Sequence, residues 1–197
     1  MQTNVLEYLE GSVESFSEKI CYSDGKTEYT FSQVYEKARA IGSFLLKNGV
    51  SHMPVVVFMK KNPQAIVSFL GSLYAGCYYV PMDEEMPAHR IELIFRTLGD
   101  CAVITDSRSL KNVHAAGCTD NVFMFEDASA FPVDETALRR VRSSQIDTDP
   151  IYIVFTSGST GIPKGVCACH RSVIDYIEHF SEVMRFSSDT VFGNQAP

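Results

Sequence analysis

An apolar run over residues 54–59, without a single polar side chain, constrains the fold more than any other feature of the sequence. A half-exposed strand alternates apolar and polar residues, whereas an unbroken apolar run is typical of a strand covered by helices on both faces. Segments with the 3–4 spacing of amphipathic helices lie on either side, at residues 30–48 and 62–74. This alternation predicts an α/β fold, a layered and mostly parallel sheet with helices on both faces.

Local signals mark the ends of several expected elements. Residues 30–33 form a capping-box sequence, Asn62-Pro63 suits the start of a helix, and Asp24-Gly25 suits the turn of a short hairpin over residues 20–29. Residues 128–149 are polar and are expected to connect two elements, with one short helix at 135–142. Further helices are expected over residues 4–17, 87–98 and 172–184, with a weaker helical or loop stretch at 110–116, and further strands over residues 77–80, 101–105, 122–125, 151–155 and 165–169.

Size and charge exclude several classes of protein. The 197 residues fit one domain or a domain with an added layer, and 45% hydrophobic with 21% charged residues is ordinary for a globular protein. The net charge is −7, from 17 basic and 24 acidic residues. A nucleic-acid backbone requires clustered Lys and Arg, so we expect no nucleic-acid partner. The small cluster of Arg139, Arg140 and Arg142 is interpreted as the solvated face of a helix.

The sequence gives no indication of a membrane segment. No apolar run reaches the roughly 20 residues of a membrane span, and the first residues lack the basic and apolar regions of a secretory signal. We therefore expect a cytoplasmic protein without a membrane partner, whose six cysteines are reduced.

The cysteines do not predict a metal site. None has C-x-x-C spacing, and only Cys167 and Cys169 lie close together. On a strand these two side chains point to one face and His170 to the other, so the three cannot converge on one ion. The cysteines are interpreted as buried small hydrophobic residues.

The candidate functional site is a loop between two apolar runs in residues 151–166. Its glycines allow close backbone approach to an anion, its hydroxyls donate hydrogen bonds, and its lysine supplies a point charge. These properties suit a polyphosphate, and ATP is the first ligand to consider. The candidate binding residues are Thr156, Ser157, Gly158, Ser159, Thr160, Gly161 and Lys164.

Other phosphate loops and a nucleophile site are excluded by spacing. The loop lacks the Gly-Lys-Ser/Thr junction of a Walker loop and the Gly-x-Gly-x-x-Gly of a dinucleotide fold, and Ser157 stands where a hydrolase elbow needs its first glycine. A strand, rather than a helix, is expected after the loop, so no helix dipole contributes. The alternative is an ordinary Ser/Gly loop between two strands.

Four segments carry a resemblance to a known family. Residues 151–166 resemble the phosphate-loop core motif of the AMP-forming adenylate-forming superfamily, which contains acyl-CoA synthetases, luciferases and amino-acid adenylation domains. Residues 73–83 resemble the Ala-Gly…Val-Pro segment of its amino-acid-activating branch, and residues 87–91 resemble that branch's Pro-x-x-Arg-Ile. Residues 189–197 resemble the lead-in to a later core segment.

The resemblance implies a two-step ligase reaction. A carboxylate, expected to be an amino acid, attacks ATP to give an acyl-adenylate and pyrophosphate, and a thiol then takes the acyl group. The thiol would be a carrier-protein phosphopantetheine or coenzyme A. Residues 156–161 and Lys164 would surround the β- and γ-phosphates, with Mg²⁺ neutralising the remaining charge. None of them is a nucleophile or a general base, so the chain offers no complete set of catalytic residues.

The same resemblance implies an incomplete domain. Residues 1–197 would form part of an N-terminal, ATP-binding domain, without the later portion or the C-terminal domain, and would be inactive alone. Apolar surface left exposed would favour self-association. The alternative is a non-catalytic nucleotide-binding or interaction module that retains the fold. His170 would either approach the substrate or be a structural residue at a strand–helix junction, and the sequence leaves both open.

Overall fold

A computed structural model describes residues 2–156 and 163–194. A six-stranded sheet in the order β6-β5-β3-β4-β7-β8 forms its centre, and β1 and β2 form a separate antiparallel pair. The strands are β1 (Ile20–Ser23), β2 (Glu28–Thr30), β3 (Pro54–Phe58), β4 (Tyr78–Met82), β5 (Ala102–Thr105), β6 (Val122–Met124), β7 (Pro150–Thr156) and β8 (Lys164–Cys169). The helices are α1 (Leu6–Phe16), α2 (Phe31–Lys47), α3 (Pro63–Tyr74), α4 (Ala88–Leu98), α5 (Leu110–Ala115), α6 (Phe125–Ser129), α7 (Glu135–Ser144) and α8 (His170–Met184).

The unbroken apolar run is strand β3, in the interior of the sheet. It pairs in parallel with β4 on one side and β5 on the other, and all five of its residues are buried. Strand β7 continues the parallel part through Tyr152, which lies opposite Tyr79, and β8 alone runs antiparallel. The predicted fold class, a mostly parallel sheet with helices on both faces, is confirmed.

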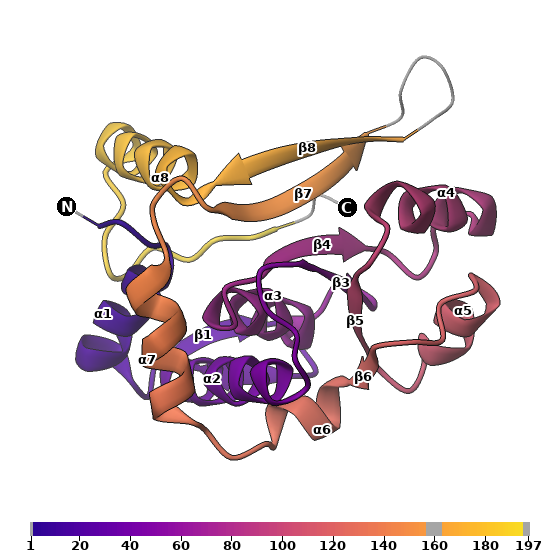
Figure 1. Cartoon of the computed structure of the whole chain (residues 1–197). Coiled ribbons are helices and arrows are strands. Elements are labelled where there is room, and N and C mark those ends of the chain that lie inside the picture. The colour runs from indigo at the N-terminus through magenta and orange to yellow at the C-terminus, as the bar shows by residue number, and fades with distance from the viewer. Residues whose placement is uncertain (1, 157–162, 195–197) are drawn as a thin grey trace.

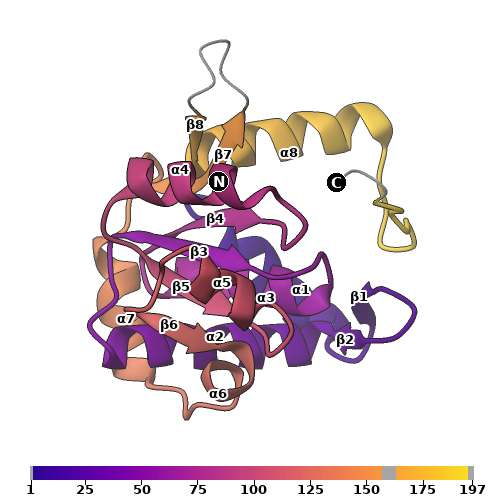
Figure 2. The same cartoon turned by 90° about the vertical axis from the view of Figure 1, so that its right-hand side faces the viewer.

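Alternate residues of β3 enter two cores. Val55 and Val57 pack into the larger core with residues of α1, α2, α3 and α7. Val56 and Phe58 point to the opposite face and pack into a smaller core with residues of α4 and α5. Figures 1 and 2 show these two helix layers on either side of the sheet, with α8 and the β7–β8 hairpin together at one edge.

Helices α2 and α3 pack at very short range across the larger core. A Cβ atom added at Gly71 would lie 2.5 Å from Cγ2 of Ile41, and one added at Gly42 would lie 2.6 Å from Cβ of Tyr74. Real side chains do not approach so closely, so glycine at these two positions sets the separation of the helices.

The predicted helix starts are confirmed where the capping side chain and the amide that it caps lie within a few residues of each other. Thr30 and Gln33 form the predicted capping box, and the Asn62 side chain accepts a hydrogen bond from the Ala65 amide at the start of α3. Asp24 and Gly25 lie in the turn between β1 and β2, as predicted.

Three expectations are wrong in detail. Phe125 begins α6 instead of ending the strand before it, because its ring is buried under the sheet with the larger core. His170 begins α8, two residues earlier than predicted, so it does not alternate with the cysteines of a strand. Arg142 is not on a solvated face: it is half-buried and forms ion pairs with Glu7 and Glu10 of α1.

Candidate functional site

The candidate loop leaves the sheet at the edge where the parallel strands end. Phe58 of β3 lies opposite Met82 of β4 and Thr105 of β5, so these three strands finish at one level. Strand β7 runs in the same direction and ends at Thr156. In open α/β sheets, ligands bind outside the carboxyl ends of the strands. The loop therefore starts where such a fold offers a binding site.

The described ends of the loop are two of the predicted binding residues. Thr156 lies opposite Lys164 across the β7–β8 hairpin, and its Oγ1 donates a long hydrogen bond of 3.4 Å to the Lys164 carbonyl. Both residues are exposed, so the hydroxyl and the ammonium are open to a ligand. Ser157, Gly158, Ser159, Thr160 and Gly161 lie outside the described residues.

Helix α4 braces the root of the loop. Nη2 of Arg90 donates to the carbonyl oxygen of Phe155 over 3.2 Å, and Phe155 immediately precedes Thr156. Ile153 and Phe155 also pack against the smaller core, to which Ile91 and Ile94 of α4 belong. The sequence singled out Arg90 only through the resemblance of residues 87–91 to a family motif. It did not predict the contact, because Phe155 lies 65 residues later in the chain.

Carboxylates at the same edge are engaged in the turns after β4 and β5. Asp83 accepts from the Glu85 amide at 2.8 Å, and Asp106 accepts from the Ser109 amide at 2.8 Å. Glu84 accepts from the Ser109 hydroxyl at 2.7 Å, which joins the two turns. The sequence did not predict this link. An Asp whose side chain can accept from amides two and three residues later, as Asp106 does from Arg108 and Ser109, is nevertheless a usual turn signal.

The C-terminal described segment returns to the edge of the sheet. Nζ of Lys61, which follows β3, donates to the backbone and side-chain oxygens of Asn194 at 3.3 and 3.2 Å. This contact spans 133 residues, and no local pattern of the sequence indicates it. It brings residues 189–194, with their resemblance to a core lead-in, to the carboxyl end of β3.

His170 lies at the opposite end of the hairpin from the loop. It is 1% exposed, and its Nδ1 accepts a hydrogen bond from the Val5 amide at 3.2 Å. Burial, with a smaller contribution from Arg142, lowers the pKa of His170 below its ordinary value of 6.5. Five residues of strand lie between it and Lys164, so the two are separated by about 20 Å. Its contacts are those of a structural residue that ties α8 to the N-terminal segment.

The described residues contain no cluster of three or more His, Cys, Asp or Glu side chains arranged to hold a metal ion. Cys167 lies on β8, the last strand of the sheet, and is exposed, so its prediction as a buried residue is wrong. Cys169 is the N-cap residue of α8. In the part of the chain that the structure describes, no helix is long and apolar enough to cross a membrane.

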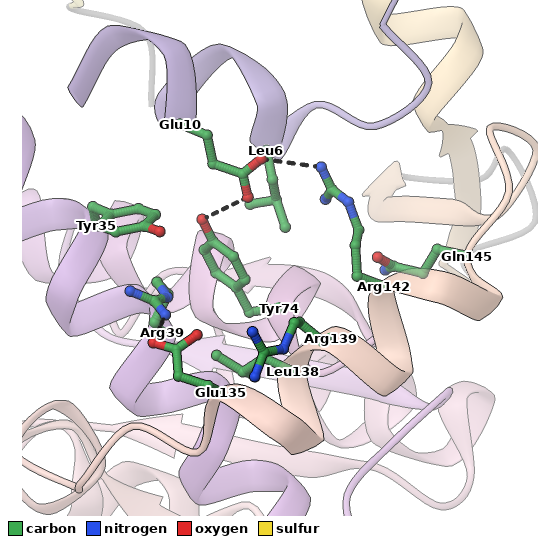
Figure 3. A pocket seen from close by; sticks show the side chains of 10 residues that line it. All are labelled: Leu6, Glu10, Tyr35, Arg39, Tyr74, Glu135, Leu138, Arg139, Arg142 and Gln145. Carbon is green, nitrogen blue, oxygen red and sulfur yellow. Dashed lines mark hydrogen bonds and ion pairs between the residues drawn. The ribbon is translucent and has the colours of Figure 1, made fainter. Parts of the chain in front are cut away.

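A half-open cavity of about 140 Å³ lies far from the loop, among α1, α2, α3 and α7 (Figure 3). Glu10 connects its two sides, because one carboxylate oxygen accepts from the Tyr74 hydroxyl at 3.1 Å and the other pairs with Arg142 at 3.2 Å. Burial, reinforced by Glu10, raises the pKa of Tyr74 far above its ordinary value. Arg39 pairs with Glu135 across the same opening. Most of these groups are paired with one another, although Nη1 of Arg142 is buried without a partner among the described residues. The arrangement is that of a structural tie between helices.

Comparison with known proteins adds the family. The family model described as AMP-binding enzyme matches residues 9–197. The chain belongs to the AMP-binding enzyme family. The resemblance to AMP-forming, adenylate-forming enzymes is thereby confirmed.

Relatives of known function support the same family. A D-alanine–D-alanyl carrier protein ligase of Listeria monocytogenes is 31% identical over all of this chain and 39% of the ligase. A component of the plipastatin synthase of Bacillus subtilis is 30% identical over 96% of this chain and 7% of the synthase component. The chain therefore spans about 39% of the length of the carrier-protein ligases that it matches.

The fold agrees with solved structures of the family. The structure titled McyG A-PCP complexed with phenylalanyl-adenylate superimposes with a TM-score of 0.79 at 19% identity, over 95% of this chain and 36% of the other. At this identity the match establishes the fold, and the fold is that of the N-terminal domain of adenylate-forming enzymes.

Proposed function

We propose that this chain is the ATP-binding part of an AMP-forming ligase that activates a carboxylate as an acyl-adenylate and transfers it to a thiol. The observation that carries the proposal is the placement of Thr156 and Lys164. In a chain of the AMP-binding family, they stand exposed where the parallel strands end, at the two ends of a loop rich in hydroxyls and glycines.

Their chemistry fits a polyphosphate. The Lys164 ammonium provides a mobile positive charge, and the Thr156 hydroxyl provides a donor beside it. We assign Ser157, Gly158, Ser159, Thr160 and Gly161 to the same phosphate site, on their sequence alone. Hydrogen-bond donors held around the departing pyrophosphate stabilise its developing charge and so lower the barrier to nucleotidyl transfer, without forming a covalent bond to it. When bound with ATP, Mg²⁺ would neutralise part of the triphosphate charge, and no described carboxylate is assigned to it.

Two similar proteins support an amino acid as the carboxylate and a carrier protein as the acceptor. The Listeria relative is a ligase of D-alanine and a D-alanyl carrier protein, and the McyG structure holds phenylalanyl-adenylate. The resemblance of residues 73–83 and 87–91 to the amino-acid-activating branch points the same way. Coenzyme A is the other acceptor to test, since a fatty acyl CoA synthetase of Mycobacterium tuberculosis shares the fold.

We further propose that residues 1–197 form part of an N-terminal domain and do not complete the reaction alone. The second candidate function is a non-catalytic nucleotide-binding or interaction module that retains the fold. Under either candidate, α8 and β8 expose a face of large apolar side chains that favours self-association. A second copy of the chain is the partner we propose for that face.

Calorimetric titration of the purified chain with Mg-ATP tests the phosphate site. We expect measurable binding, and we expect Lys164→Met to weaken it about tenfold or more, because a charged donor to phosphate is lost. Lys26→Met is the matched control, since Lys26 is an exposed lysine in the turn between β1 and β2. Absence of heat with the unaltered chain would reject the proposed function.

Exchange of labelled pyrophosphate into ATP, measured with the same preparation and a panel of amino acids, tests completeness. No exchange is expected. Exchange that depends on one amino acid would disprove the inactivity of residues 1–197 and would identify the substrate.

A further inference from the structure

Arg90 joins helix α4 to the strand that leads into the loop. Its Nη2 donates to the carbonyl oxygen of Phe155 over 3.2 Å. The next residue, Thr156, is the first of the proposed phosphate-binding residues. A hydrogen bond at this carbonyl therefore fixes the backbone one residue before the site.

Packing extends this hold to the second strand of the hairpin. A Cβ atom added at Gly165 would lie 3.4 Å from the Phe155 ring and 2.7 Å from Cγ2 of Ile153. The backbone of β8 thus runs directly against the two side chains that face the smaller core beside α4. Lys164, adjacent to Gly165, is located by the same contacts.

One donor of the Arg90 guanidinium has no partner among the described residues. Its Nε is buried and makes no hydrogen bond within residues 2–156 and 163–194, a property that it shares with Nη1 of Arg142. A buried donor without an acceptor destabilises the folded state, so Arg90 is held against the hairpin at a cost in stability.

We propose that Arg90 is a positioning residue for phosphate binding. By holding the Phe155 carbonyl, it fixes Thr156 and Lys164 at the spacing and direction in which both meet a polyphosphate. This inference rests on the proposed function of the loop. It assigns Arg90 no contact with the ligand.

A matched variant on the same helix separates the effect of the Arg90 hydrogen bond from the effect of its positive charge. Arg96 also lies on α4, but its side chain is 72% exposed and pairs with Glu92 four residues away. Arg96→Met removes the same charge without touching the hairpin. Arg90→Met removes the charge and the bond to Phe155, and Arg90→Lys keeps the charge and one donor.

Two measurements are made on the whole chain: Mg-ATP affinity by calorimetry, and the rate at which trypsin cuts after Lys164 under native conditions. We expect Arg90→Met to bind about tenfold more weakly and to be cut about tenfold faster, because one charged hydrogen bond is lost. Arg90→Lys should recover most of both losses, and Arg96→Met should match the unaltered chain. Arg90→Gln replaces Arg90→Met if the latter does not fold, as judged by circular dichroism.

Two outcomes overturn the inference. The first is a folded Arg90→Met with unchanged affinity and cleavage. The second is an equal loss of affinity in Arg96→Met, which would reduce Arg90 to a distant charge. If the unaltered chain does not bind Mg-ATP, the proposed function fails and the phosphate role fails with it. The cleavage rates then still decide whether Arg90 holds the hairpin.

Discussion

Strands β3 and β8 belong to one sheet and yet have opposite surroundings. All five residues of β3 are buried between two helix layers, whereas the first four residues of β8 are exposed. Strand β3 has a neighbour on each side, and β8 is the last strand of the sheet. We call the part around β3, α2 and α3 the interior half, and the part formed by β7, β8, α8 and residues 185–194 the edge half. The interior half is built for stability, and the edge half holds the candidate site.

The difference continues into the helices. Helices α2 and α3 are packed so closely that glycine is required between them, while α8 presents apolar side chains to solvent. The exposed large apolar side chains of this edge half are Val154, Val166, Tyr176, Ile177, Phe180, Val183, Met184, Val191 and Phe192. Substitutions in the two halves should therefore have different consequences: loss of stability in the interior, and altered association at the edge.

The largest effect is expected at the α2–α3 contact. Gly71→Ala would place a methyl group 2.5 Å from Ile41, and the resulting overpacking should exceed the gain in helix propensity. We expect a loss of about 2 kcal/mol in the free energy of unfolding, measured with urea. Gly11→Ala in α1 is the control, since its methyl group would meet no atom within 4 Å and should stabilise by up to about 1 kcal/mol. Equal results for the two variants would contradict the close packing.

A smaller, pH-dependent effect is expected at His170, where the edge half is tied to the N-terminal segment. The fold lowers the pKa of His170, so below pH 6.5 the unfolded chain binds more protons than the folded chain. The contribution of this residue is therefore complete above pH 6.5 and is lost as the pH falls from there toward the lowered pKa. The charged groups around it are Arg142, Asp149, Asp147 and Glu7.

His170→Asn tests this tie, because the asparagine oxygen can accept the Val5 amide but does not titrate. We expect a loss of about 1 kcal/mol at neutral pH and a weaker dependence of unfolding on pH between 6.5 and 5. A pH profile parallel to that of the unaltered chain would show that His170 does not set it.

The smallest effect on folding is expected on the exposed face of α8. Val183 is 72% exposed, so Val183→Lys should change the free energy of unfolding by less than about 0.5 kcal/mol. It should nevertheless reduce self-association, measured by light scattering over a range of concentrations. Val133→Lys, at an exposed valine before α7, is the control and should leave association unchanged. A monomeric unaltered chain would contradict the proposed partner.

The sequence predicts what local chemistry determines. The capping box at Thr30 and the N-cap at Asn62 are each completed within three residues, and both are found. The buried strand β3 is also found, because its composition alone requires cover on both faces. The start of α8 was missed because its N-cap residue is Cys169, which is not a usual capping residue.

Contacts between distant segments are what the sequence does not provide. The loop residues were identified by composition, but the brace from Arg90 depends on α4 and β7 meeting across the sheet. The roles of Arg142 and His170 depend in the same way on where α1 lies. Such pairings follow from the packing of whole elements, which no window of neighbouring residues encodes.

The bond between Val5 and His170 also sets an order of events during synthesis. The acceptor of the Val5 amide lies 165 residues later in the chain, so the ribosome makes it roughly 10–30 s after the donor. Until then α1 can dock on α2 and α3 but cannot complete its attachment. The segment that contains Val5 is therefore secured only long after it has been made.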